Sequence, residues 1–199
     1  MRVKVAVLVS GGGTNLQALL DANLQHGEIA FVLSNRKAAY ALERARARGV
    51  ETAVLSNVME PDPVRRDEKL LEMLRARGIQ VVALAGYLGI LGEKTVSAYE
   101  NRIVNIHPAL IPSFCGKGYY GLRVHEAALA RGVKVTGATA HLVNLGVDEG
   151  PILLQKAVDV LPGDTPETLQ KRVMEQAEWK LLPAAVDMVC QWAEEEETL

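Results

Sequence analysis

Short apolar runs alternate with longer amphipathic segments along the first half of the chain. The apolar runs are rich in valine, isoleucine, leucine and alanine and show no polar face, a pattern typical of strands buried on both sides. The segments between them repeat apolar residues at helical spacing and end at glycine. We therefore expect strands at 3–10, 28–35, 50–56, 79–86 and 102–106, separated by helices at 14–27, 38–49 and 63–78. This alternation predicts an α/β fold with a doubly wound, mostly parallel sheet.

The pattern changes after residue 120. Residues 121–132 have helical spacing, but two strand-like runs follow at 133–144 and 151–160, linked by the loop "LGVDEG". These runs predict an antiparallel C-terminal extension of the sheet. The remainder of the chain predicts a long C-terminal helix, interrupted near Pro183.

Composition and charge narrow the classes of protein. Of the 199 residues, 49% are apolar and 23% are charged, which is typical of a soluble globular protein. No linker or repeat divides residues 1–199, so we expect a single domain. The net charge of −2 gives no reason to expect nucleic acid or an anionic membrane as a partner. No run approaches a membrane span, and residues 1–13 are interpreted as the first strand rather than a signal peptide, so a cytoplasmic protein is expected.

A glycine-rich loop, "SGGGTNLQALL" at 10–20, joins the first predicted strand to the first helix. Its glycines allow the backbone to approach a ligand closely. We expect Thr14 and Asn15 to cap the helix, whose N–H groups and dipole favour an anion. Leu16 stands where a dinucleotide fingerprint needs glycine, and the lysine of a P-loop is absent. The loop is therefore either a site for a small anion such as a phosphomonoester or a plain tight turn.

The fifth predicted strand ends with two polar side chains on one face, Asn105 and His107, and Pro108 stops it at once. Ligands of open parallel sheets bind beyond the carboxyl ends of strands, so this pair could belong to a catalytic site. Asp148 lies in the loop between the last two predicted strands. If that loop folds over the strand end, Asp148 would orient His107 and favour its charged form. The alternatives are a pair that satisfies a buried turn and an aspartate that only serves its own turn.

Other candidates for chemistry are weaker. Cys115 could act as a nucleophile beside His107, but a small residue packed in a loop is the simpler interpretation. The two cysteines lack disulfide or zinc spacing, and the four histidines form no HExxH motif, so no metal is expected.

Five segments together resemble one family. In chain order they are "SGGGTNLQALL", "VVALAGYLGIL", "NIHPALIPSF", "VTGATAHLVNLGVDEGPILLQ" and "GDTPETLQKRVMEQAEWKLLP". By these motifs the chain resembles the glycinamide ribonucleotide formyltransferases, folate-dependent enzymes of purine synthesis, from residue 3 to about residue 190. The resemblance implies the Rossmann-like formyltransferase fold. It also implies direct transfer, without a metal, of the formyl group of the cosubstrate 10-formyltetrahydrofolate to the amine of glycinamide ribonucleotide, a step of de novo purine (IMP) synthesis.

The resemblance also assigns roles to residues by their position in the motifs. Glu178 matches an acidic residue that contacts the glycinamide or ribose end of the substrate. The residues that match catalytic positions are Asn105, His107 and Asp148. Those that match the phosphate-binding loop are Gly12, Gly13, Thr14 and Asn15. Those that match the folate-binding positions are Leu88, Gly89, Ile90, Leu91, Val143, Asn144 and Val147.

Residues 1–100 would then form the phosphate-binding half, and residues 101–199 the folate-binding and catalytic half. Pro63 stands where many members have an arginine, so phosphate contact from that helix would fall to Arg65 or Arg66. The partners implied are the two small-molecule substrates, bound by a monomer or homodimer.

Two other functions stay open. A 10-formyltetrahydrofolate hydrolase uses a similar trio with water as acceptor, but it carries an N-terminal regulatory domain, whereas this chain begins at its first strand. A non-catalytic folate- or nucleotide-binding module is the third possibility, and retention of all three polar residues speaks against it. Lys117, in the long loop after the fifth strand, could reach the site.

Overall fold

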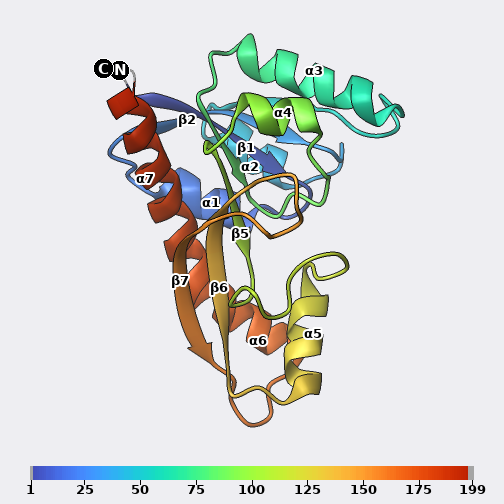
Figure 1. Ribbon diagram of the computed structural model, residues 1–199, viewed down its shortest axis with the longest axis vertical. Helices are drawn as coiled ribbons and strands as arrows, with labels where there is room; N and C mark the ends of the chain where they lie inside the picture. The colour runs from blue at the N-terminus through green and yellow to red at the C-terminus, as the bar shows by residue number, and fades with distance from the viewer. Residues whose placement is uncertain (1, 197–199) are drawn as a thin grey trace.

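The computed structural model describes residues 2–196 and contains a seven-stranded sheet of order β3-β2-β1-β4-β5-β6-β7 (Figure 1). The strands are β1 (Val3–Val9), β2 (Gly27–Ser34), β3 (Glu51–Val54), β4 (Val81–Leu84), β5 (Ile103–His107), β6 (Val135–Leu142) and β7 (Ile152–Asp159). Strands β1 to β5 pair in parallel, whereas β6 pairs antiparallel to both β5 and β7. The predicted doubly wound sheet with an antiparallel C-terminal extension is therefore confirmed.

Helices cover both faces of this sheet. They are α1 (Thr14–Asp21), α2 (Ala41–Ala47), α3 (Pro63–Arg75), α4 (Glu93–Ala98), α5 (Leu122–Arg131), α6 (Pro166–Val173) and α7 (Trp179–Glu196), with a π-helical turn, η1 (Met174–Glu178), between the last two. Figure 1 shows α7 lying along the sheet beside β6 and β7. Among residues 2–196, no helix combines the length and the apolar character that crossing a membrane requires.

Alternate residues of β1 point into two separate cores, which explains why the strand is apolar throughout. Val5 and Val7 pack with the apolar sides of α1, α2, α6 and α7, while Ala6 and Leu8 pack with α3 and α4. All four side chains are completely buried. A strand between two helix layers has no solvent-facing side, so the sequence shows no alternation there.

The C-terminal helix departs from the prediction. Pro183 lies inside α7, and the interruption falls earlier, at η1. Proline cannot donate a hydrogen bond to the carbonyl four residues before it, and here that carbonyl belongs to Trp179, the first residue after the widened turn. The π-helical turn carries Glu178, so the irregularity lies at a candidate site residue. α4 was not predicted, because six residues are too few to give a clear helical period.

Candidate functional site

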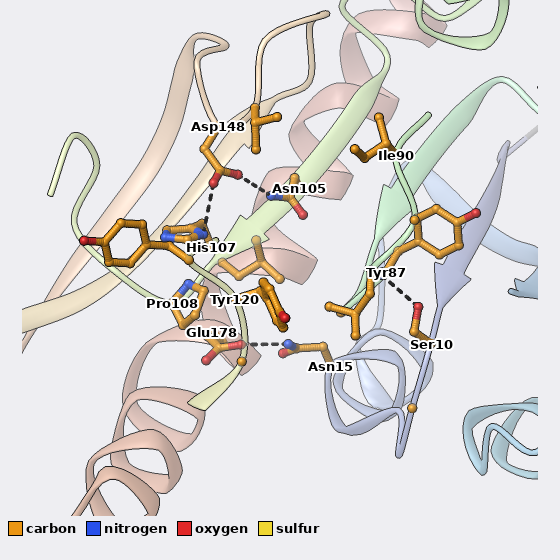
Figure 2. A pocket seen from close by; sticks show the side chains of 18 of the residues that line it. Ser10, Asn15, Tyr87, Ile90, Asn105, His107, Pro108, Tyr120, Asp148 and Glu178 are labelled. Atoms are coloured by element: carbon orange, nitrogen blue, oxygen red, sulfur yellow. Dashed lines mark hydrogen bonds and ion pairs between the residues drawn. The ribbon is translucent and has the colours of Figure 1, made fainter. Parts of the chain in front are cut away.

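A cavity of about 730 Å³ opens at the carboxyl ends of β1, β4 and β5. Parallel strands place the loops that follow them at one edge of the sheet, and this volume is in the range usual for ligand sites. The far wall is made by residues 116–121, by the loop between β6 and β7, and by the segment from α6 through η1. Figure 2 shows Asp148 pointing toward Asn105 and His107, and Glu178 pointing toward Asn15.

Three polar side chains meet at the end of β5. Asn105 and His107 come from the strand itself, and Asp148 reaches them from the β6–β7 loop (Figure 2). Asp148 Oδ1 lies 3.4 Å from Asn105 Nδ2, and Asp148 Oδ2 lies 3.5 Å from His107 Nδ1. The predicted approach of Asp148 to the strand end is therefore confirmed. All three residues line the cavity.

Asp148 is held as a carboxylate. The Gly116 N–H donates a hydrogen bond of 2.9 Å to Oδ2, and Oδ1 lies 3.6 Å from His141 Nε2. Burial alone would raise the pKa of Asp148, but His141, the Gly116 N–H and His107 outweigh burial, and the pKa lies below its ordinary value. The negative charge at the centre of the trio is thus present at neutral pH.

His107 is buried, and both of its ring nitrogens face acceptors. Nε2 lies 2.8 Å from the Phe114 carbonyl oxygen, and Nδ1 faces Asp148. Burial lowers the pKa of His107 below its ordinary value, although the Asp148 carboxylate and the Phe114 carbonyl stabilise the protonated ring. We had expected Asp148 to favour the charged form. It acts in that direction, but burial has the larger effect.

His141 orients the amide of Asn105. Its Nδ1 lies 2.9 Å from the Leu142 carbonyl oxygen, and its Nε2 lies 3.0 Å from Asn105 Nδ2. The Asn105 amide nitrogen also lies 3.4 Å from Asp148 Oδ1, so the side chains of His141 and Asp148 together hold this amide at the cavity.

The glycine loop presents backbone N–H groups. Gly11 and Gly12 direct their carbonyls toward α2, to Ala41 N at 3.1 Å and Arg44 Nε at 2.8 Å. In a trans peptide the N–H points opposite to the carbonyl, so the N–H groups of Gly12 and Gly13 face the other way. Such successive N–H groups favour an anion. Gly11 itself lines the cavity.

The helix cap in this loop differs from the prediction. Gly13, with φ 75°, is the N-cap of α1, and neither Thr14 nor Asn15 makes a capping hydrogen bond. A Cβ at Gly13 would lie 2.6 Å from Ala41 Cβ, so the close packing of α2 requires glycine here. The Thr14 hydroxyl contacts Met174 Sδ at 3.7 Å instead.

Asn15 connects the loop to η1 across the cavity (Figure 2). Its Nδ2 donates a hydrogen bond of 2.7 Å to Glu178 Oε2, and both residues line the cavity. Glu178 is only 6% exposed, and burial raises its pKa to about 7 despite the hydrogen bond from Asn15. Glu178 therefore carries a proton in part of the molecules at neutral pH.

The predicted folate-binding residues divide into two groups. Leu88, Gly89, Ile90 and Val147 line the cavity. Leu91 and Val143 instead pack against the core on the α3 and α4 side of the sheet, and Asn144 Oδ1 accepts a hydrogen bond from Gly146 N. Lys117 lines the cavity as well.

Several lining residues were not found from the sequence. They include Ser10, Arg36, Tyr87, Tyr119, Tyr120, Gln170 and Met174. Most lie in loops, where no periodicity tells which way a side chain points. The tyrosines of "GKGYYG" carried a signal that could have been used, because aromatic side chains in a loop next to a proposed site are often binding residues.

Comparisons with known proteins indicate one family. The formyl transferase family matches residues 3–186. A chloroplastic phosphoribosylglycinamide formyltransferase of Arabidopsis thaliana is 40% identical over 96% of this chain and 66% of its own length. The human trifunctional purine biosynthetic protein adenosine-3 is 41% identical over 94% of this chain, which spans 18% of that protein. The crystal structure of glycinamide ribonucleotide transformylase 1 from Symbiobacterium toebii superimposes with a TM-score of 0.89 at 43% identity, covering 96% of this chain and 89% of that one.

Proposed function

Because the chain belongs to the formyl transferase family, we propose that it transfers the formyl group of 10-formyltetrahydrofolate to the amine of glycinamide ribonucleotide, a step of purine synthesis. The observation that carries the proposal is the convergence of Asn105, His107 and Asp148 on one cavity at the end of β5. A side-chain amide, an imidazole and a carboxylate are the groups that acyl transfer to an amine needs.

The two substrates bind to different walls of the cavity. The ribonucleotide phosphate binds at Gly12–Asn15, in the first half of the chain, and Glu178 contacts the ribose or glycinamide end. The folate lies against Leu88, Ile90 and Val147, which are respectively 48%, 87% and 46% exposed although apolar. Apolar side chains exposed at a cavity support binding of a flat, partly apolar ligand there.

In the reaction, the substrate amine attacks the formyl carbon and a new carbon–nitrogen bond forms. The formyl oxygen becomes an oxyanion, which accepts a hydrogen bond from the side-chain amide of Asn105 in exchange for one of the present partners of that amide. One such donor lowers the barrier by roughly 3 kcal/mol in other acyl-transfer enzymes. The bond between the formyl carbon and N10 of the folate then breaks. Asp148, directly or through water, passes the proton lost by the amine to the departing N10.

His107 supplies the second donor once its ring is released. In the structure its Nε2 is bonded to the Phe114 carbonyl, so the ring reaches the oxyanion only if it exchanges that carbonyl for the substrate. The negative oxyanion would then stabilise the protonated imidazole against the effect of burial. This exchange makes residues 110–121 part of substrate binding.

The proposal also covers the cellular setting. We expect a cytoplasmic enzyme that acts on small molecules as a monomer or homodimer and binds no nucleic acid. The small net charge of −2 supports the last point.

The test is the acceptor dependence of donor consumption. We expect purified protein to deformylate 10-formyltetrahydrofolate only when glycinamide ribonucleotide is present, with one formylated ribonucleotide formed per folate released. Deformylation at the same rate without the acceptor would identify a hydrolase. Binding of folate without turnover under either condition would identify a non-catalytic module and contradict the proposal.

A further inference from the structure

The glycine loop cannot by itself balance the charge of a phosphomonoester. Such a group carries up to two negative charges, whereas a helix N-terminus offers the equivalent of about half a positive charge, and backbone N–H groups are neutral. A site that binds a phosphorylated substrate in preference to its unphosphorylated counterpart therefore requires a cationic side chain close to the loop.

Few cations are available for this purpose. Among the residues the structure describes, those that both carry a positive charge and line the cavity are Arg36 and Lys117. Lys117 adjoins Gly116, whose N–H is bonded to Asp148, so it lies at the end where the trio is found. Arg66, one of the candidates from the sequence, donates to the carbonyls of Glu60 and Pro61. Neither it nor Arg65 lines the cavity.

Arg36 lies at the other end, beside the glycine loop. It follows the end of β2, where Ser34 pairs with Val9 immediately before the glycine loop. Its backbone N–H donates a hydrogen bond of 3.0 Å to the Ser34 hydroxyl, which fixes the turn. Within residues 2–196 its guanidinium has no hydrogen-bond or ion-pair partner. Arg44, the other arginine near the loop, is already bonded to the Gly12 carbonyl and to Gln17.

A second observation points to a ligand at this end of the cavity. Asn15 is 8% exposed and lines the cavity, and its Oδ1 is buried without any hydrogen-bond partner in the described chain. A buried acceptor without a donor is costly, so a ligand with hydroxyl groups would satisfy it. A ribose placed next to the phosphate site carries such hydroxyls.

We propose that Arg36 binds the phosphate of the acceptor substrate and sets the preference of the enzyme for a ribose phosphate over the free riboside. The inference rests on the proposed function for the identity of the acceptor. Arg36 supplies a bidentate, permanently charged donor from one side, and the N–H groups of Gly12 and Gly13 supply neutral donors from the other.

The experiment compares Arg36→Ala with Lys37→Ala, a neighbouring exposed lysine that does not line the cavity. We expect Arg36→Ala to raise KM for glycinamide ribonucleotide about tenfold or more, as loss of a charge-assisted hydrogen bond does. Both kcat and KM for the folate should stay within about twofold of wild type. The preference for the ribonucleotide over its dephosphorylated riboside, as a ratio of kcat/KM values, should fall by the same factor as KM rises. Arg36→Lys should retain part of the preference for the ribonucleotide, and Lys37→Ala should leave both this preference and KM at their wild-type values.

Equal losses with the phosphorylated and dephosphorylated acceptors would overturn the inference, and so would equal effects of Arg36→Ala and Lys37→Ala. Calorimetric binding of ribose 5-phosphate separates this inference from the proposed function, because it needs no turnover. If the wild type transfers no formyl group but binds ribose 5-phosphate more tightly than Arg36→Ala, the proposed function fails and the role of Arg36 stands. If the two proteins bind it equally, Arg36 has no such role.

Discussion

Asp148 joins the polar side chains of the site, since both the amide of Asn105 and the ring of His107 approach its carboxylate. Asp148→Asn keeps the size of the side chain but removes the charge. We expect kcat to fall about 100-fold or more while KM for either substrate changes little, because the proton relay is lost and the binding surfaces remain.

The matched control is Glu149→Gln, which removes a charge from the adjacent, exposed position of the same loop. It should retain the kcat of wild type. If Asp148→Asn loses binding and turnover by equal factors, Asp148 shapes the pocket and does not take part in proton transfer.

Glu178 gives a pH dependence of stability whose sign follows from its raised pKa. Between its ordinary value near 4.5 and its folded value of about 7, the folded protein keeps a proton that the unfolded chain releases. Stability is therefore lost as the pH rises through this window, by roughly 3 kcal/mol at most. Glu178→Gln keeps an acceptor for Asn15 and carries no charge, so its melting temperature should fall less than that of wild type between about pH 5 and about pH 8. Equal falls in both proteins would show that Glu178 does not titrate in this range.

At the residue level, alternation along the strand predicted Asn105 and His107 at its end, whereas Asp148 was joined to them by the family motifs and on the condition that its loop folds over that end. The sequence did not predict the state of His107, because burial and the Phe114 carbonyl depend on how residues 110–121 fold back. Among the residues that it suggested for folate binding, Leu91 and Val143 have partly buried side chains packed against the core, and their contact with folate stays a prediction.

The loop between β6 and β7 is the element that delivers Asp148, and Gly150 fixes its exit. A Cβ at Gly150 would overlap the carbonyl oxygen of Leu142 at the end of β6. We expect Gly150→Ala to displace the loop, lowering kcat together with a loss of about 1–3 kcal/mol of stability. Leu145→Ala, at a 66% exposed position of the same loop, is the control and should leave kcat and the melting temperature unchanged. Wild-type kcat in Gly150→Ala would mean that the loop position is not fixed by this contact.

The helix α5 contains a buried histidine without partners. His125 is completely buried, and neither ring nitrogen has a hydrogen-bond partner in the part of the chain described. Burial, with a smaller effect from His107, lowers its pKa to about 4. The unfolded chain takes up the proton near pH 6.5, so stability is lost as the pH falls from there toward 4. In His125→Leu, unfolding measured in urea should show less loss of stability on acidification than in wild type. The same loss in both would exclude His125 as the cause.

At the level of elements, the long periodic segments were predicted well and the irregular ones were not. Helix α3 was expected at 63–78 and is found at Pro63–Arg75, because its proline start and its apolar spacing are both local signals. The π-helical turn η1 was missed, since its residues also fit an ordinary helical pattern. Its widened turn immediately precedes the part of α7 where Pro183 cannot bond to the Trp179 carbonyl.

The whole molecule brings together groups that lie far apart in the sequence. The glycine loop follows β1, the apolar wall follows β4, the amide and imidazole end β5, and Glu178 arrives from the C-terminal helical segment. Because β1, β4 and β5 are parallel, the glycine loop, the apolar wall and the Asn105–His107 pair lie at one edge of the sheet. This arrangement could be predicted from the sequence. Strand β6 runs antiparallel to β5 and ends beside the first residues of β5, so the β6–β7 loop folds back along β5 to bring the Asp148 carboxylate to Asn105 and His107.

The account is tested most directly by following the formyl carbon. The wild-type protein is mixed with glycinamide ribonucleotide and with 10-formyltetrahydrofolate labelled in the formyl group, and the label is located after a single turnover. We predict that the label is recovered in the formylated ribonucleotide, with none as free formate. Label recovered as formate, or retained entirely in the folate, would contradict direct transfer at the end of β5.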